Sequence, residues 1–167
     1  CNMCITGDMT MSISRCTQNP TFMEEWRKGW HPERMNAKGA SRNILVVGSG
    51  PAGLEAARAL SLRGYDVALA ESAREIGGRV RRERLLPGLA AWGRVVDYRQ
   101  YQLSQRNNVQ TYLDSFLDAD SALEFGFENV CIATGSEWRR DCVARQHVVA
   151  PPIDAAMPLF TPDDIMN

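Results

Sequence analysis

The 167 residues of this chain are 44% hydrophobic and 23% charged, which is the composition of a globular domain with its own core. The formal net charge of −1 provides no basic field, so we expect neither nucleic acid nor an anionic membrane as a partner. No apolar run approaches the roughly 18 residues of a membrane-spanning helix, and no signal-peptide pattern is present. We therefore expect a cytoplasmic protein whose five cysteines are thiols or metal ligands and not disulfides.

Three cysteines stand in the first region, residues 1–40, which has little hydrophobic periodicity and is expected to be irregular. Their spacing is C-x2-C-x11-C, at Cys1, Cys4 and Cys16. Three thiolates can hold zinc or an iron–sulfur cluster; the nearest histidine, His31, lies too far along for usual zinc spacing, and a cubane cluster needs a fourth ligand. Because the chain opens on Cys1 and not on Met, we expect a piece of a longer protein, with that ligand upstream. The alternative is free cysteines in a loop.

The second region, residues 41–135, alternates strand-like and helix-like stretches. A short apolar run at 44–47 suits a buried parallel strand, and the helical spacing after it has Pro51 in its first turn and Gly64 past its end. The pattern predicts a parallel sheet with helices against it, an α/β fold of the Rossmann type. The expected strands are 44–47, 67–71, 109–112 and 127–133, and the expected helices are 51–63, 89–106 and 121–124. The last region, residues 136–167, is rich in Pro and Asp and is expected to be an extended tail.

The turn between the first strand and helix reads Gly48-Ser49-Gly50-Pro51-Ala52-Gly53. In a dinucleotide-binding turn the first glycine allows a tight bend, the second lets a pyrophosphate approach the backbone, and the third lets the helix pack closely on the strand. The helix N-terminus then offers free N–H groups and the positive end of its dipole to the anion. The alternative is a tight turn with no ligand.

An acidic residue at the end of the second strand, Glu71, completes the dinucleotide pattern. It stands 18 residues after Gly53, close to the spacing of about 20 at which a carboxylate binds ribose hydroxyls. Its carboxylate can accept hydrogen bonds from both adenosine ribose hydroxyls and would repel a 2′-phosphate. The sequence therefore favours FAD, ADP or NAD over NADP.

Two further stretches resemble flavoproteins that have two dinucleotide domains. One is the glycine-containing loop after Glu71, which in those proteins passes the diphosphate; the other is the strand ending in A-T-G, where their chain crosses toward the second nucleotide domain. A flexible loop and a strand capped by a turn are the alternatives. The resemblance implies cofactor contacts from Ser72, Gly78, Arg79, Ala133, Thr134 and Gly135.

The cysteine segment carries the most specific likeness. The stretches CTQNP at 16–20 and EEWRKGWHPE at 24–33 resemble the segment after the last cluster cysteine in the trimethylamine dehydrogenase family. These are iron–sulfur flavoproteins of the old-yellow-enzyme class, related to 2,4-dienoyl-CoA reductase. The opening CNMC resembles the latter part of their cluster motif, which implies that Cys1, Cys4 and Cys16 are the second, third and fourth ligands of a 4Fe–4S cluster. The likeness continues through the glycine turn, Glu71 and TPDD at 161–164.

The resemblance implies an electron-transfer role. In such enzymes a (β/α)8 barrel, which nothing here resembles, carries FMN and the substrate site. Electrons then pass singly through the cluster to an electron-transferring flavoprotein, whereas reductase relatives take electrons from NAD(P)H through FAD. Residues 48–71 would hold ADP or the ADP half of FAD, and we expect the complete enzyme to be a homo-oligomer.

We assign no catalytic residue in this chain. His31, beside Pro32, is expected to be a packing residue, and His147 lies in the tail. Two competing interpretations remain open. One is an ADP- or FAD-binding module without redox chemistry, and the other is a zinc-stabilised nucleotide-binding domain.

Overall fold

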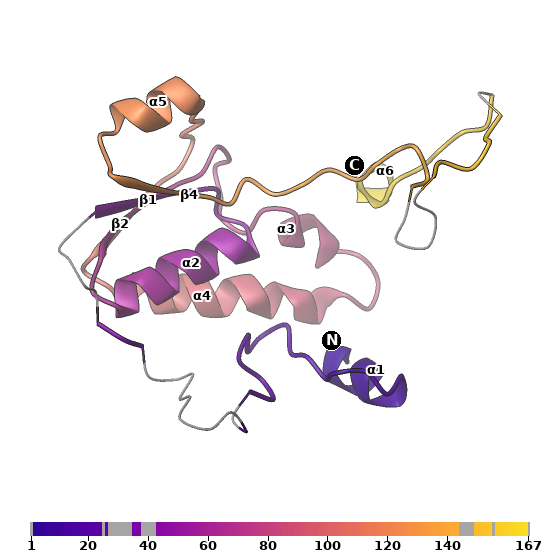
Figure 1. The fold of residues 1–167 in the computed structure, drawn as a ribbon, viewed down its shortest axis with the longest axis horizontal. Coiled ribbons are helices and arrows are strands. Elements are labelled where there is room, and N and C mark those ends of the chain that lie inside the picture. The colour runs from indigo at the N-terminus through magenta and orange to yellow at the C-terminus, as the bar shows by residue number, and fades with distance from the viewer. Residues whose placement is uncertain are drawn as a thin grey trace. The chain divides into compact units, whose positions relative to one another are not determined.

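The computed structural model describes residues 2–24, 26, 35–37, 43–143, 149–154 and 156–166. The chain divides into two compact parts, Cys1–Thr134 and Gly135–Asn167, and Figure 1 traces the course of each. Within the described residues, no helix has both the length and the apolar character needed to cross a membrane.

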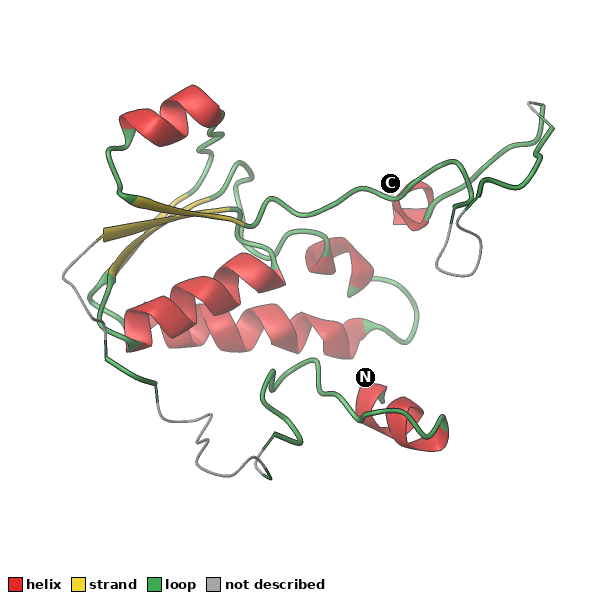
Figure 2. Ribbon diagram, viewed as in Figure 1, coloured by secondary structure: helices red, strands yellow, loops and turns green. Residues whose placement is uncertain are grey.

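The larger part is built on one parallel sheet. Its strands among the described residues are β1 (Asn43–Val47), β2 (Asp66–Ala70), β3 (Val109–Tyr112) and β4 (Asn129–Ile132). Their order is β3-β2-β1-β4, and β1 pairs Ile44 with Val67 of β2 and Val46 with Cys131 of β4. Figure 2 shows the sheet with helices beside it. All three pairings are parallel, so the carboxyl ends of the strands meet at one edge. The predicted Rossmann-type α/β fold is confirmed.

Helices cover both faces of this sheet. Helices α2 (Pro51–Leu62) and α4 (Arg94–Ser104) lie on one face, and α5 (Ala119–Glu124) lies on the other (Figure 1). Successive side chains of a strand point to opposite faces. Accordingly, Ile44 and Val46 of β1 belong to the core formed with α2 and α4, whereas Leu45 packs on the side of α5.

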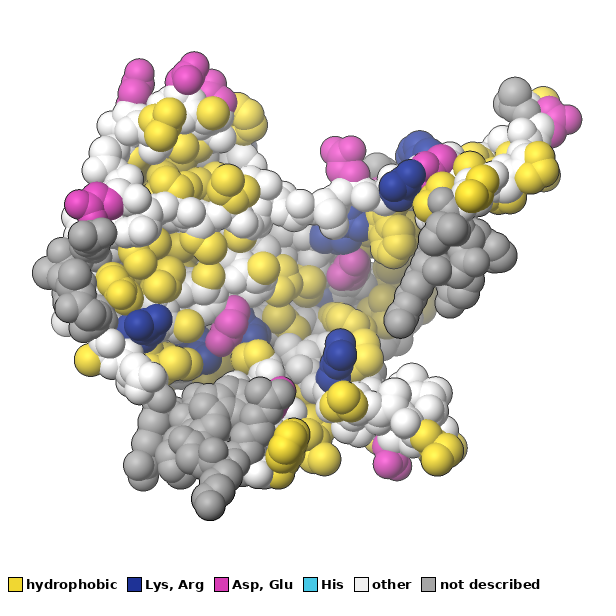
Figure 3. Space-filling view, in the orientation of Figure 1, with side chains coloured by type: hydrophobic (Ala, Val, Ile, Leu, Met, Phe, Trp, Pro, Cys, Tyr) yellow, Lys and Arg dark blue, Asp and Glu magenta, His cyan; other side chains and the backbone are white. Residues whose placement is uncertain are grey.

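Strand β4 is an edge of the sheet, and it is shorter and more exposed than the predicted strand 127–133. Val130 and Ile132 are 39% and 77% exposed, while Cys131 is half-buried and packs against the core. Figure 3 shows hydrophobic side chains gathered over this edge and α5. An apolar edge strand of this kind is a surface that native proteins normally cover.

The predicted helix 89–106 is interrupted. The structure has a 3-10 helix, η1 (Ala90–Gly93), directly followed by α4, and a further short helix, α3 (Val80–Glu83), before it. At the junction, a Cβ on Gly93 would lie 2.3 Å from the guanidinium carbon of Arg84, which is the end of a flexible side chain and can move aside. A 3-10 turn keeps nearly the helical spacing of apolar residues, so the pattern did not reveal the break.

The described stretch 2–24 contains the helix α1 (Met3–Met9), although irregular backbone was expected there. The hydroxyls of Thr6 and Thr10 donate to the carbonyl oxygens four residues earlier, at 3.1 and 2.9 Å, and so support the helix locally. None of the residues of α1 is buried. The helix therefore adds no hydrophobic core of its own.

The smaller part, expected to be an extended tail, contains the short helix α6 (Pro162–Met166). The backbone N–H and hydroxyl of Thr161 both donate to Oδ2 of Asp164, at 2.6 and 2.8 Å, which is a capping arrangement at a helix start. Arg140 donates to Oδ1 of Asp164 at 2.6 Å. These hydrogen bonds, that of Arg140 first, lower the pKa of Asp164 to about 2.

Candidate dinucleotide-binding site

The turn between β1 and α2 contains the three predicted glycines, and packing requires two of them. Gly48 has a φ of +97°, and a Cβ there would lie 2.4 Å from the carbonyl oxygen of Ala133. A Cβ on Gly53 would lie 1.9 Å from the carbonyl oxygen of Gly48. The end of β4 and the first turn of α2 therefore approach the turn at distances that only glycine allows.

Gly50 has no such explanation among the described residues. Its φ of −64° and ψ of 178° are open to any residue, and a Cβ there would meet no atom within 4 Å. No side chain caps α2, which begins at Pro51, so the first-turn amides, including that of Ala52, have no side-chain acceptor. Open space at an uncapped helix N-terminus is the setting in which a phosphate binds.

Glu71 follows β2 and lies buried against the turn. Its Oε2 accepts hydrogen bonds from the backbone N–H and the hydroxyl of Ser49, at 2.8 and 2.5 Å. Its Oε1 accepts from the backbone N–H of Ala73 at 2.9 Å and from the hydroxyl of Ser72 at 3.3 Å. Burial acts to raise the pKa of Glu71, but these hydrogen bonds, that of the Ser49 hydroxyl first, outweigh it and lower the pKa. The carboxylate is therefore ionised at neutral pH and directed toward the turn.

The loop after β2 folds back onto the turn. The N–H of Gly77 donates to the carbonyl oxygen of Ser49 at 2.9 Å. Gly78 has a φ of +56°, and a Cβ there would lie 3.0 Å from the Cα of Gly50. Arg79 is the N-cap residue that directly precedes α3. The structure thus brings Gly78 into direct contact with the glycine that faces open space.

The end of β4 reaches the turn from the other side. The N–H of Ala133 donates to the carbonyl oxygen of Val47 at 2.8 Å, and the Cα of Thr134 would lie 3.1 Å from a Cβ on Gly48. Gly135 is the first residue of the smaller part of the chain. Of the three residues of the A-T-G ending, the structure therefore brings Ala133 and Thr134 to the turn.

The cysteine segment places Cys4 in α1 and Cys16 in the loop that follows. The Sγ of Cys16 accepts the backbone N–H groups of Gln18 and Asn19, both at 3.4 Å. Cys1 lies outside the described residues, and within them no three His, Cys, Asp or Glu side chains are grouped so as to hold a metal ion. The assignment of the three cysteines as metal ligands stays a prediction, and the two histidines also lie outside the described residues.

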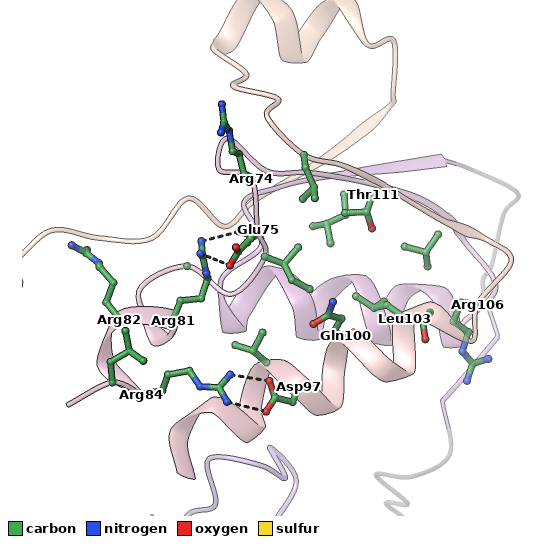
Figure 4. Close-up of a pocket in the computed structure, with 18 residues that line it drawn as sticks. Arg74, Glu75, Arg81, Arg82, Arg84, Asp97, Gln100, Leu103, Arg106 and Thr111 are labelled. Atoms are coloured by element: carbon green, nitrogen blue, oxygen red, sulfur yellow. Dashed lines mark hydrogen bonds and ion pairs between the residues drawn. The ribbon is translucent and has the colours of Figure 1, made fainter. Parts of the chain in front are cut away.

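A cavity of about 970 Å³ extends from Gly78 between the loop after β2, α4 and β3 (Figure 4). Aliphatic side chains of the sheet and α4 line it, and arginines surround it; Arg81 is ion-paired with Glu75, and Arg84 with Asp97. The sequence analysis did not single out this feature. The sequence feature that could have indicated it is the stretch 74–84, which holds five arginines and two glutamates.

A second feature that the sequence analysis missed joins α2 to α4. Arg99 of α4 is buried and donates through Nε to Oε2 of Glu55 in α2 at 2.7 Å. Glu55 also accepts from Arg58, at 2.6 Å. No local pattern indicates this ion pair, because Arg99 and Glu55 are 44 residues apart in sequence.

Comparison with known proteins places this geometry in a family. Residues 46–116 match the family described as NAD(P)-binding Rossmann-like domain. The chain is 40% identical to dimethylamine dehydrogenase of Hyphomicrobium sp. (strain x), over 99% of this chain and 24% of that protein. Histamine dehydrogenase from Rhizobium sp. 4-9 is a similar solved structure, with 78% identity, a TM-score of 0.87, and coverage of 99% of this chain and 26% of that one. The solved structure of 6-hydroxypseudooxynicotine amine oxidase from Pseudomonas geniculata N1 is also similar, with 51% identity and a TM-score of 0.81. The match covers 91% of this chain and 23% of that one.

The fold and the glycine turn define the larger part of the chain as a Rossmann-like domain of the dinucleotide-binding class. The chain is, more particularly, a relative of the flavoprotein amine dehydrogenases of the histamine and dimethylamine dehydrogenase type. The resemblance drawn from the sequence to trimethylamine dehydrogenase-like proteins is confirmed. The chain spans about a quarter of the length of the relatives it matches.

Proposed function

We propose that this chain is the nucleotide-binding and electron-transfer part of an iron–sulfur flavoprotein that dehydrogenates amines. The observation that carries the nucleotide part is Gly50, where neither backbone conformation nor packing calls for a glycine. The adjoining start of α2 also lacks a capping side chain. A bound diphosphate accounts for both facts, because it needs close approach to the backbone and free amides.

The proposed nucleotide is FAD or ADP, which share the adenosine diphosphate moiety. In this proposal residues 50–53 bind the diphosphate and Glu71 binds the ribose, with Ser72, Gly78 and Arg79 beside them. Because the lowered pKa keeps Glu71 ionised, a 2′-phosphate on the ribose would meet a negative charge. This disfavours NADP.

For the cysteine segment we propose a 4Fe–4S cluster held by Cys1, Cys4 and Cys16 and by a fourth cysteine from outside this chain. Such a cluster supplies one-electron transfer when bound. The support is the surroundings of Cys16, since two backbone N–H groups donate to its Sγ, and hydrogen bonds to a ligand sulfur tune the potential of the cluster that it holds. The absence of buried residues in α1 fits a segment that a metal group, and not a core, organises.

In the whole enzyme we propose a barrel domain that carries FMN and the amine site, with an electron-transferring flavoprotein as acceptor. The support is likeness to amine dehydrogenases, and the 78% identity with histamine dehydrogenase makes histamine the first amine to test. An enzyme of the reductase type, fed by NAD(P)H, would instead carry FAD in this domain. Extraction of the bound nucleotide and mass spectrometry distinguish ADP from FAD.

The substitution Gly50→Val tests the nucleotide site. A side chain at this position enters space that the protein leaves open, so we expect ADP binding, measured by titration calorimetry, to fall by at least a factor of about 100 while the melting temperature falls by less than about 4 °C. The matched control is Ala119→Val, at an exposed residue of α5. Unchanged ADP affinity in Gly50→Val would contradict the proposed site.

A further inference from the structure

The two oxygens of the Glu71 carboxylate are not equivalent. Oε2 accepts two hydrogen bonds from one residue, Ser49, at 2.8 and 2.5 Å, and Ser49 is 0% exposed. A carboxylate oxygen has two lone-pair positions, and at Oε2 buried donors fill both. Oε2 therefore serves to tie the end of β2 to the turn between β1 and α2.

Oε1 has a different set of donors. The backbone N–H of Ala73 donates to it at 2.9 Å, and the exposed side chain of Ser72 donates at 3.3 Å. The amide is fixed by the backbone, whereas the hydroxyl is solvent-accessible, makes a long hydrogen bond and can rotate away. One of the four acceptor positions of Glu71 is therefore exchangeable.

From this asymmetry we infer that Glu71 reads a single ribose hydroxyl, through Oε1, at the position that the Ser72 hydroxyl holds in the free protein. The inference rests on the proposed nucleotide site and differs from the expectation from sequence that the carboxylate can accept hydrogen bonds from both ribose hydroxyls. The second ribose hydroxyl finds no acceptor on Glu71, because the backbone N–H and the buried hydroxyl of Ser49 already fill both acceptor positions of Oε2. Ser49 is thus a specificity-determining residue, which limits how much of the ribose the site recognises.

The inference is tested with three ligands and the wild-type protein. Titration calorimetry with ADP, 2′-deoxy-ADP and 3′-deoxy-ADP should show that one deoxy analogue binds about tenfold more weakly than ADP, the size expected for one hydrogen bond to a charged group. The other analogue should bind within about twofold of ADP. Equal losses for both analogues, or no loss for either, would overturn the inference. Failure of ADP itself to bind would overturn the proposed nucleotide site as well, so the two failures are distinguishable.

The substitution Ser49→Ala sharpens the test. It frees the second acceptor position of Oε2, so the analogue that wild type tolerates should now also bind about tenfold more weakly than ADP. Ser104→Ala is the control, because it removes a serine hydroxyl at an exposed position of α4, where it donates to the carbonyl oxygen of Tyr101, and should leave the wild-type ranking of the two analogues unchanged. A Ser49→Ala protein that melts normally and ranks the analogues as wild type does would show that Ser49 plays no part in ribose recognition.

Discussion

The glycine turn at residues 48–53 and the cysteine segment at residues 2–24 carry the two predicted sites of this chain, and they are held in different ways. At the turn the protein supplies its own contacts, since Gly48 packs on Ala133 and Ser49 binds Glu71. In the cysteine segment no residue of α1 is buried, and the Sγ of Cys16 is held by backbone amides. The turn is therefore held by contacts of the polypeptide itself, whereas we propose that the cysteine segment depends on a bound group for its order.

The substitution Gly53→Val would break the turn. A Cβ there overlaps the carbonyl oxygen of Gly48 at 1.9 Å, and backbone cannot move aside as a side chain can, so we expect a loss of more than about 4 kcal/mol in the free energy of unfolding. The same substitution at Gly50, where a Cβ meets nothing within 4 Å, should cost less than about 1 kcal/mol. Urea denaturation of the two variants measures the difference. Equal losses would mean that the turn is not packed as described.

The buried ion pair behind the turn gives the next largest effect. Arg99→Met removes a side chain that is 4% exposed and leaves Glu55 with one arginine, so we expect a loss of about 3 kcal/mol in the free energy of unfolding. The control is Arg84→Met, because Arg84 and Asp97 are 38% and 55% exposed and such pairs contribute less than about 1 kcal/mol. Equal losses of unfolding free energy in the two variants would show that the ion pair between α2 and α4 stabilises the fold no more than an exposed pair does.

The substitution Cys16→Ser should affect the other region alone. We expect loss of bound iron and sulfide and faster proteolysis within residues 2–24, while the free energy of unfolding of the sheet changes by less than about 0.5 kcal/mol. Cys142→Ser, at an exposed cysteine of the smaller part, should retain the iron. Full iron content in Cys16→Ser would contradict the ligand assignment, and a large loss of sheet stability would contradict the contrast between the two regions.

The parts of the fold that follow from local chemistry could be predicted from the sequence. The strands at β1 to β3, the helix that begins at Pro51 and the close packing of Gly53 on Gly48 all depend on residues close together along the chain. The break between η1 and α4 could not be predicted, because a 3-10 turn and an α-helix place their apolar residues at nearly the same spacing.

The polar contacts of the site divide in the same way. The position of the Glu71 carboxylate beside the turn was expected from its spacing to Gly53 in the sequence. Its hydrogen bond from the Ser49 hydroxyl was not expected, since nothing in the sequence of a glycine turn indicates which residue a serine there will contact. The pair of Arg99 and Glu55 was missed for the same reason. Interactions between side chains distant in sequence become visible only when the fold brings them together.

The most direct test of the nucleotide site is a crystal structure of the protein with ADP. The diphosphate is expected against Gly50 and the first turn of α2, with the ribose at Oε1 of Glu71. A diphosphate bound instead among the arginines around the cavity beside α3 and α4, with the space before Gly50 empty, would contradict the assignment of the glycine turn.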